Sequence, residues 1–139
     1  NEIVSQDDRV FFLGDFALAN KEQIIQWGNM LNGRKVMIYG NHDYCKPEVY
    51  YAAGFEHVSR WPIVIHSRYL LSHAPMFAGA ESGVDPGNLI NIHGHIHDKI
   101  EQGPTVSTRS ACVCVERWEY KPVELHELES LIISCRNSH

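Results

Sequence analysis

RVFFLGDFALANKEQIIQWGNMLNGRKVMIYG, residues 9–40, contains two short apolar runs on either side of an amphipathic segment. The runs at 9–13 and 36–39 each stop at a glycine and are typical of buried strands. Between them, Asn20 predicts a helix N-cap whose capping box is completed by Gln23. A strand, a helix and a strand in this order predict a parallel βαβ unit with a right-handed crossover.

Later segments continue the α/β pattern. They are a helix at 47–53, a hairpin of 63–65 with 69–72, strands at 89–92 and 113–118, and a final amphipathic helix carrying Val123, Leu125, Leu128, Leu131 and Ile132. We assign Trp27 and Trp118 to core faces. Residues 75–88, rich in Gly, Pro and Ala, are too long for a simple turn and are expected to form the functional loop. The whole pattern predicts a mixed α/β sandwich.

The composition is that of an ordinary globular chain. Its 139 residues are 44% hydrophobic and 21% charged, and 12 basic side chains against 17 acidic ones give a net charge of −5. This length suits a single domain spanning 1–139. No apolar run approaches the ~18 residues of a membrane span, so we expect a soluble protein with no membrane partner. The acidic balance disfavours binding of a long nucleic-acid duplex by basic charge.

The cysteines give a second indication of the cellular setting. They are Cys45, Cys112, Cys114 and Cys135, and they form no Cys-x-x-Cys pair. A small disulfide scaffold would carry more cysteines, and a zinc ribbon would space them differently. We therefore expect reduced, structural thiols, which favours a cytoplasmic location.

Metal-capable side chains follow four of the apolar segments. Asp15 follows the first, Asn41-His42-Asp43 the second, His73 the third and His95-Ile96-His97 the fourth. Loops that leave the carboxyl ends of neighbouring strands converge on one crevice in open α/β sheets. Oxygen and imidazole donors without thiolate suit Mn, Fe, Zn, Ni or a similar divalent transition metal. A donor set without cysteine is typical of a catalytic site rather than a structural zinc site.

The remaining histidines and three arginines are expected to have structural roles. His93 lies within a predicted strand and is interpreted as a packed or hydrogen-bonded core residue. Those expected at the solvated surface are His57, His66, His126, His139, Arg60, Arg68 and Arg109.

Four of these segments, in order along the chain, resemble motifs two to five of the calcineurin-like metallophosphoesterases. The segments are Gly14-Asp15, Gly40-Asn41-His42-Asp43, His73 and Gly94-His95-Ile96-His97. The tail at 118–123 also resembles small bacterial and phage members of that family. The resemblance implies a four-layer αββα sandwich with a dinuclear metal site.

The same resemblance implies a role for each ligand. Asp15 would bridge both ions, Asn41, His73 and His95 would complete one of them, and His97 would bind the other. A carboxylate suits the bridging position because its two oxygens can face both cations, whereas an amide or imidazole serves one ion without adding negative charge.

The implied reaction is the hydrolysis of a phosphomonoester or phosphodiester by a metal-activated water. His42 would stand near the leaving group as an acid or charge stabiliser, with Asp43 orienting it. The substrate would be a small phosphoester or nucleotide, selected by the loop 75–88, where Met76, Phe77, Glu81 and Asp85 would face the crevice.

One motif of that family is missing from the chain. The family opens with Asp-x-His ahead of its Gly-Asp, but the fourteen residues before Asp15 contain no histidine. Asp7 and Asp8 lie at the far end of the strand that leads to Asp15, roughly 20 Å away at ~3.3 Å per residue, so they cannot substitute. We therefore expect an N-terminally truncated member with one well-formed metal site, a weak second one, and an exposed sheet edge open to homo-oligomer formation.

Two other interpretations stay open. If the missing motif abolishes hydrolysis, the chain would be a catalytically impaired metal-binding or scaffold protein on the same fold. The retromer scaffold subunit is such a case. A redox or zinc module built on the cysteines is the weakest alternative, because Cys45 and Cys135 lie far from any other cysteine in the sequence.

Overall fold

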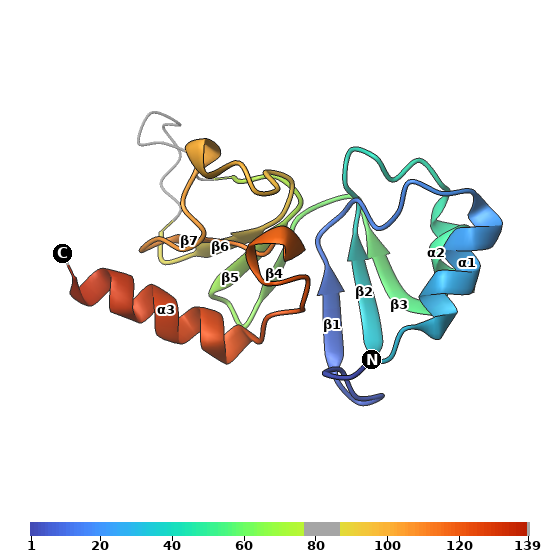
Figure 1. The fold of residues 1–139 in the computed structure, drawn as a ribbon, viewed down its shortest axis with the longest axis horizontal. Helices are drawn as coiled ribbons and strands as arrows, with labels where there is room; N and C mark the ends of the chain where they lie inside the picture. Colours follow the sequence, from blue (N-terminus) through green and yellow to red (C-terminus); the bar gives the residue numbers. More distant parts are fainter. Residues whose placement is uncertain (77–86, 139) are drawn as a thin grey trace. The chain divides into compact units, whose positions relative to one another are not determined.

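The protein is represented by a computed structural model that describes residues 1–76 and 87–138. It is an α/β protein whose contacts divide the chain into two compact units, Asn1–Pro62 and Ile63–His139. Each unit carries one β-sheet, three-stranded in the first and four-stranded in the second (Figure 1). None of the helices in the described part of the chain has the length and apolar character of a membrane span.

The first unit contains the expected βαβ arrangement and extends it by one strand. Its elements are β1 (Arg9–Phe12), α1 (Lys21–Met30), β2 (Arg34–Ile38), α2 (Pro47–Ala52) and β3 (Phe55–Ser59). Both strand pairs in the order β1-β2-β3 are parallel, which confirms the parallel unit. The sequence did not indicate β3, because its central residues Glu56 and His57 are exposed and polar and hide the strand pattern.

The two helices of this unit pack against the same face of the sheet (Figure 1). The buried cluster between them consists of Ile24, Met37, Tyr50, Ala53 and Phe55. The capping box at Asn20 is present, with hydrogen bonds in both directions to Gln23. The assignment of Trp27 to the core is wrong, since its side chain is 41% exposed. Its neighbour Gly28 faces α2 instead, where a Cβ would collide with Ala53.

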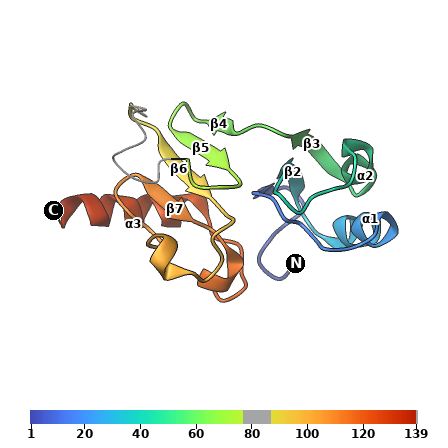
Figure 2. The same cartoon turned by 90° about the horizontal axis from the view of Figure 1, so that it is seen from above.

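The second unit begins with the predicted hairpin. Its elements are β4 (Ile63–Ile65), β5 (Tyr69–Ser72), β6 (Ile90–His93), a 3₁₀ turn at Ile100–Gln102, β7 (Ser110–Cys112), a second 3₁₀ turn at Val115–Arg117 and α3 (Leu125–Asn137). β4 and β5 pair in antiparallel fashion, and their turn residues His66 and Ser67 both have a φ of 51°, as a tight hairpin turn requires. β5, β6 and β7 are parallel neighbours, so the sheet is mixed (Figure 2).

The predicted strand at 113–118 is wrong, because the sheet ends at β7, before this segment. The chain turns sharply there: Trp118 donates its indole N–H to the carbonyl of Cys112 at 2.8 Å, and Glu119 and Tyr120 have positive φ. Trp118 is therefore half-buried in a turn rather than on a strand face. The final helix is confirmed and packs against β7 with Leu128 and Ile132 buried.

Candidate metal centre

Two loops of the first unit, those after β1 and β2, are joined by the buried carboxylate of Asp43. Its Oδ2 accepts hydrogen bonds from the backbone N–H groups of Asp15 at 2.6 Å and Gly40 at 2.7 Å. Its Oδ1 accepts from the N–H of Phe16 at 3.0 Å and from the hydroxyl of Tyr50 at 3.1 Å. Asp43, only 7% exposed, thus fixes the backbone that presents Asp15.

The Asp15 carboxylate lies against the second of these loops. Its Oδ1 accepts the backbone N–H of His42 at 2.8 Å. A Cβ at position 40 would collide with both the carboxylate and the backbone nitrogen of Asp15, so only glycine fits there. Asp15 itself has a φ of 54°, in the left-handed region of backbone conformation that residues other than glycine rarely adopt.

His42 and Asn41 are exposed at the tip of the same loop. The Nδ1 of His42 lies 3.3 Å from the hydroxyl of Tyr44. The expected partnership of Asp43 with His42 stays a prediction, because the contacts of the Asp43 carboxylate are with backbone N–H groups and Tyr50. Burial, followed by the charge of Asp43, raises the pKa of Tyr50 far above its usual value, so this hydroxyl stays a donor.

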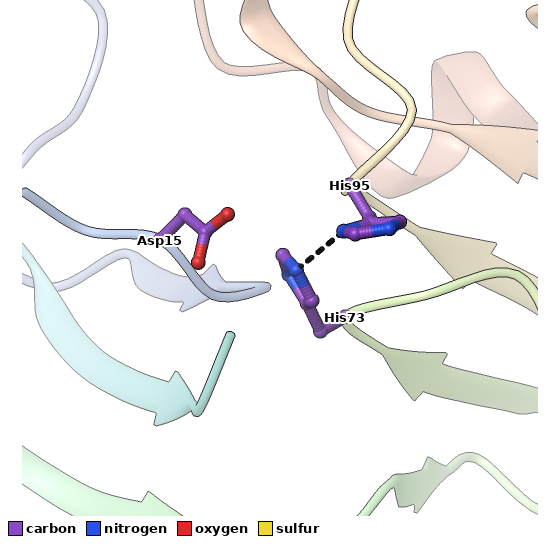
Figure 3. Close-up of side chains that lie close together, drawn as sticks. All are labelled: Asp15, His73 and His95. Carbon is purple, nitrogen blue, oxygen red and sulfur yellow. Dashed lines mark hydrogen bonds between the residues drawn. The ribbon is translucent and has the colours of Figure 1, made fainter. Parts of the chain in front are cut away.

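The second unit brings two predicted ligands into contact. The Nδ1 of His95 lies 2.9 Å from the Nε2 of His73, as the dashed line in Figure 3 shows. This proximity follows from the sheet, since Ser72 and His93 are register partners at the ends of the parallel strands β5 and β6. The loops that carry the imidazoles therefore leave the same edge.

His97 has a carboxylate partner that the sequence did not reveal. Its Nδ1 lies 2.7 Å from Oε1 of Glu116, and this contact lowers the pKa of the glutamate. The next residue, Arg117, donates to the carbonyls of His97, Lys99 and Gly103 and so holds the loop that carries the ligand. Both residues fall within the strand that the sequence predicted at 113–118, and neither stands beside a motif glycine, so no spacing signal marked them.

The remaining histidines lie as expected where the structure describes them. His93 is buried with its Nε2 3.1 Å from the hydroxyl of Ser110, and burial lowers its pKa. His57, His66 and His126 are exposed. His139 lies outside the described residues, as do Phe77, Glu81 and Asp85 of the predicted functional loop.

The arginines and cysteines lie largely as expected. Arg68 is at the surface with its side chain 40% exposed, and it is ion-paired to Glu129 at 2.6 Å. Arg60 and Arg109 are exposed. All four cysteines are free thiols.

Three of the predicted ligands have a backbone conformation that is uncommon for residues other than glycine. Among the residues that the structure describes, the non-glycine residues with positive φ are Asp15, His66, Ser67, His95, His97, Glu119 and Tyr120. The pairs at 66–67 and 119–120 are turn residues, whereas the other three are predicted metal ligands. Non-glycine residues held in this conformation are concentrated at functional sites in proteins.

The donor chemistry suits a transition metal. Asp15 of the first unit offers a carboxylate, and His73 and His95 of the second unit offer two imidazoles; Figure 3 draws these side chains. Carboxylate and imidazole ligands are those used by Mn, Fe, Zn and related ions.

Comparison with known proteins places the chain in a family. It is 31% identical to the gene 66 protein of Mycobacterium phage L5, over 85% of this chain and 70% of that protein. The chain belongs to the family of the phage gene 66 protein. It is also 28% identical to the uncharacterized protein MJ1445 of Methanocaldococcus jannaschii, over 95% of this chain and 70% of that protein. A scan against protein-family profiles gave no match.

The fold has a counterpart among solved structures. The crystal structure of the protein of unknown function AQ665 from Aquifex aeolicus matches with a TM-score of 0.62, covering 94% of this chain and 80% of that one. At 24% sequence identity this likeness supports the α/β fold alone.

Proposed function

We propose that the chain is a metal-dependent hydrolase of phosphoric esters, built as a four-layer αββα sandwich. The observation that carries this proposal is the left-handed backbone at Asp15, His95 and His97, three of the five predicted ligands. Each such residue costs of order 1 kcal/mol or more, and a fold retains that cost where the surrounding structure and the function require it.

The ligands are drawn from both units. Asp15, Asn41, His73 and His95 would hold one ion, while Asp15 and His97 alone would hold a second, weaker one. The contact of His73 with His95 supports the first assignment, because two imidazole nitrogens 2.9 Å apart can turn toward one cation. A bound divalent ion would lower the pKa of a water molecule and offset the negative charge of the phosphoryl group.

The chain's own residues supply positioning and proton transfer. Asp43 holds the loops around Asp15 through their backbone N–H groups. Glu116 orients the ring of His97, as carboxylates commonly do for histidine ligands. His42 is exposed and, with its Nδ1 near Tyr44, presents Nε2 as the nitrogen that passes a proton to the departing alkoxide.

The substrate is a small phosphoester or a nucleotide. The net charge of −5 opposes attraction of a long polyanionic duplex. A scaffold or impaired metal-binding protein is the alternative, and it differs from the proposal by binding metal without hydrolysing substrate.

The test compares hydrolysis of mono- and bis-nitrophenyl phosphate by the protein stripped with EDTA and reloaded with Mn²⁺. Asp15→Ala is expected to abolish turnover, and His42→Ala to lower it by about 10²–10⁴. The matched control is His57→Ala, an exposed histidine on β3, which should leave the rate unchanged. Hydrolysis that survives Asp15→Ala would overturn the proposal, and metal binding without any turnover would favour the scaffold.

A further inference from the structure

A second polar site lies in the second unit, in a pocket of about 530 Å³. The described residues that line it are Arg68, Asn88, Thr108, Arg109 and Arg136. Three of these side chains are guanidinium groups, which stay charged throughout the physiological pH range. Such a concentration of positive charge is unexpected in a chain with a net charge of −5.

The pocket lies at the amino ends of the parallel strands, whereas the predicted histidine ligands follow their carboxyl ends. Arg68 immediately precedes β5 and Arg109 immediately precedes β7, whereas His73 follows β5 and His95 comes after β6. The four residues of β5 separate the two ends of the strand by about 13 Å of extended chain. The arginine pocket is therefore distinct from the predicted metal ligands of this unit.

The backbone on the sheet side of this pocket is fixed by hydrogen bonds. The carbonyl of Arg68 accepts the N–H of Ile90 at 2.8 Å, and the carbonyl of Arg109 accepts the N–H of Asn91 at 2.9 Å. The backbone of each arginine is therefore held beside the first residues of β6.

The three guanidinium groups are also held individually. Arg68 pairs with Glu129 at 2.6 Å through Nη1 and stacks over the Tyr69 ring at 5.5 Å. Arg136, near the end of α3, donates from Nε to the carbonyl of Thr108 at 2.9 Å. Arg109 donates from Nη2 to the carbonyl of Gly87. Each of these hydrogen bonds uses one nitrogen of a guanidinium that has five N–H donors on three nitrogens.

The charges that converge here favour an anion. Among the residues that the structure describes, one carboxylate, that of Glu129, pairs with one of the three guanidinium groups that line the pocket, so positive charge exceeds negative charge in this described lining. Like charges brought together raise the energy of the folded chain, and a bound anion offsets that cost.

The geometry points to a phosphate group, and we propose that the pocket binds a small molecule carrying one or two phosphates. The planar fork of arginine matches phosphate oxygens with paired hydrogen bonds, and Asn88 and Thr108 add neutral polar groups. Among the described residues that line the pocket, none is aromatic or aliphatic, so stacking of a base is not provided for. The volume lies within the range of small-molecule sites.

Titration calorimetry on the full chain tests this site, with pyrophosphate and inorganic phosphate as the probes. EDTA is present throughout, so that no metal ion can hold the anion elsewhere. The wild-type protein is expected to bind pyrophosphate, and Arg109→Gln and Arg136→Gln are each expected to weaken binding at least about tenfold. Arg60→Gln, an exposed arginine of the first unit, is the matched control and should bind as the wild type does.

The outcomes separate this site from the proposed hydrolase. Asp15→Ala should lose hydrolysis and keep pyrophosphate binding, so either proposal can fail without the other. Equal affinity in the wild type, Arg109→Gln and Arg136→Gln would overturn the anion site, as would no binding by the metal-free wild type. Tighter binding of a single-stranded oligonucleotide than of pyrophosphate would also overturn it, since the ligand would then be a nucleic acid. Thermal unfolding without ligand verifies that each variant is folded.

Discussion

The two halves of the chain hold their predicted metal ligands in place by different means. In the first unit, a buried carboxylate, Asp43, collects three backbone N–H groups and a tyrosine hydroxyl, and the loop it fixes presents Asp15. In the second unit, His73 contacts His95 and His97 contacts Glu116 through side chains that are half-buried or exposed.

Because of this difference, the contacts of the two units should contribute differently to folding and to ligand binding. A buried carboxylate that satisfies several backbone donors contributes to folding, because its removal leaves those donors unpaired. Exposed imidazoles contribute little to folding, and their removal acts on what they bind. Substitutions in the first half should therefore change the free energy of unfolding, and substitutions in the second should change metal affinity.

The largest effect on stability is expected from Asp43→Asn. The amide keeps the shape of the side chain, but its NH₂ group is a donor. It would face backbone N–H groups that a carboxylate oxygen accepts in the wild type. We expect a loss of about 3 kcal/mol in the free energy of unfolding, measured by urea denaturation. Glu48→Gln, an exposed acidic residue of α2, is the control and should change stability by less than about 0.5 kcal/mol.

Gly40→Ala should follow, with a loss of about 2 kcal/mol. The added methyl group would meet the carboxylate and the backbone nitrogen of Asp15, and the backbone has little freedom to yield. Gly87→Ala is the control, because no residue that the structure describes lies within 4 Å of its Cβ position and the positive φ is what opposes the change, at a cost of about 1 kcal/mol. Equal losses in the two variants would show that the contact with Asp15 is not tight.

The fold was largely predictable where apolar periodicity and glycine or capping signals agree. The βαβ unit, the hairpin and the final helix all have such agreement. The strand pattern is misleading at β3, where solvent-exposed polar residues replace it, and at 113–118, where apolar residues fill a turn closed by Trp118. Sequence spacing carries no information about which apolar residues pair with a neighbouring strand.

The candidate site was predictable only for residues that come one to three positions after a strand. Asp15, His73 and His95 were predicted because such positions lie at the carboxyl ends of parallel strands. Glu116 was missed because it reaches His97 from a distant segment, through a side-chain contact. In the separate arginine pocket, Arg136 was missed for the same reason, since it reaches the carbonyl of Thr108 from the end of α3.

Tyr50→Phe should cost about 1 kcal/mol, since Asp43 loses one of its four donors. This substitution also changes the dependence of stability on pH. Burial raises the pKa of Tyr50 in the folded chain, so its contribution is complete below the unfolded pKa near 10 and is lost as the pH rises above that value. Between pH 9 and pH 11 the wild type should therefore lose more stability than the phenylalanine variant. Parallel losses in both proteins would show that this hydroxyl ionises freely.

His95→Ala belongs to the other half and should change the stability of the metal-free protein by less than about 0.5 kcal/mol. Its effect should fall on Mn²⁺ affinity, which we expect to drop at least about 100-fold in titration calorimetry. Elemental analysis of the wild type should give close to one ion per chain, and two tightly bound ions would contradict the weak second site. His126→Ala, an exposed histidine of α3, is the control for both measurements.

Glu116→Gln should have the smallest effect on folding, because the residue pairs with His97 at a partly exposed position where an ion pair contributes little. Because the pKa of Glu116 is lowered in the folded chain, its contact with His97 stabilises the fold above the usual glutamate pKa. This contribution is lost as the pH falls below that value. The glutamine keeps the hydrogen bond to the imidazole but removes the charge that makes the ring a stronger ligand. If Glu116 acts through His97, a second equivalent of Mn²⁺ should bind about tenfold more weakly to the variant while the first binds as before. Weakening of the first equivalent instead would place His97 in the better-formed site and reverse the assignment of ligands between the two ions.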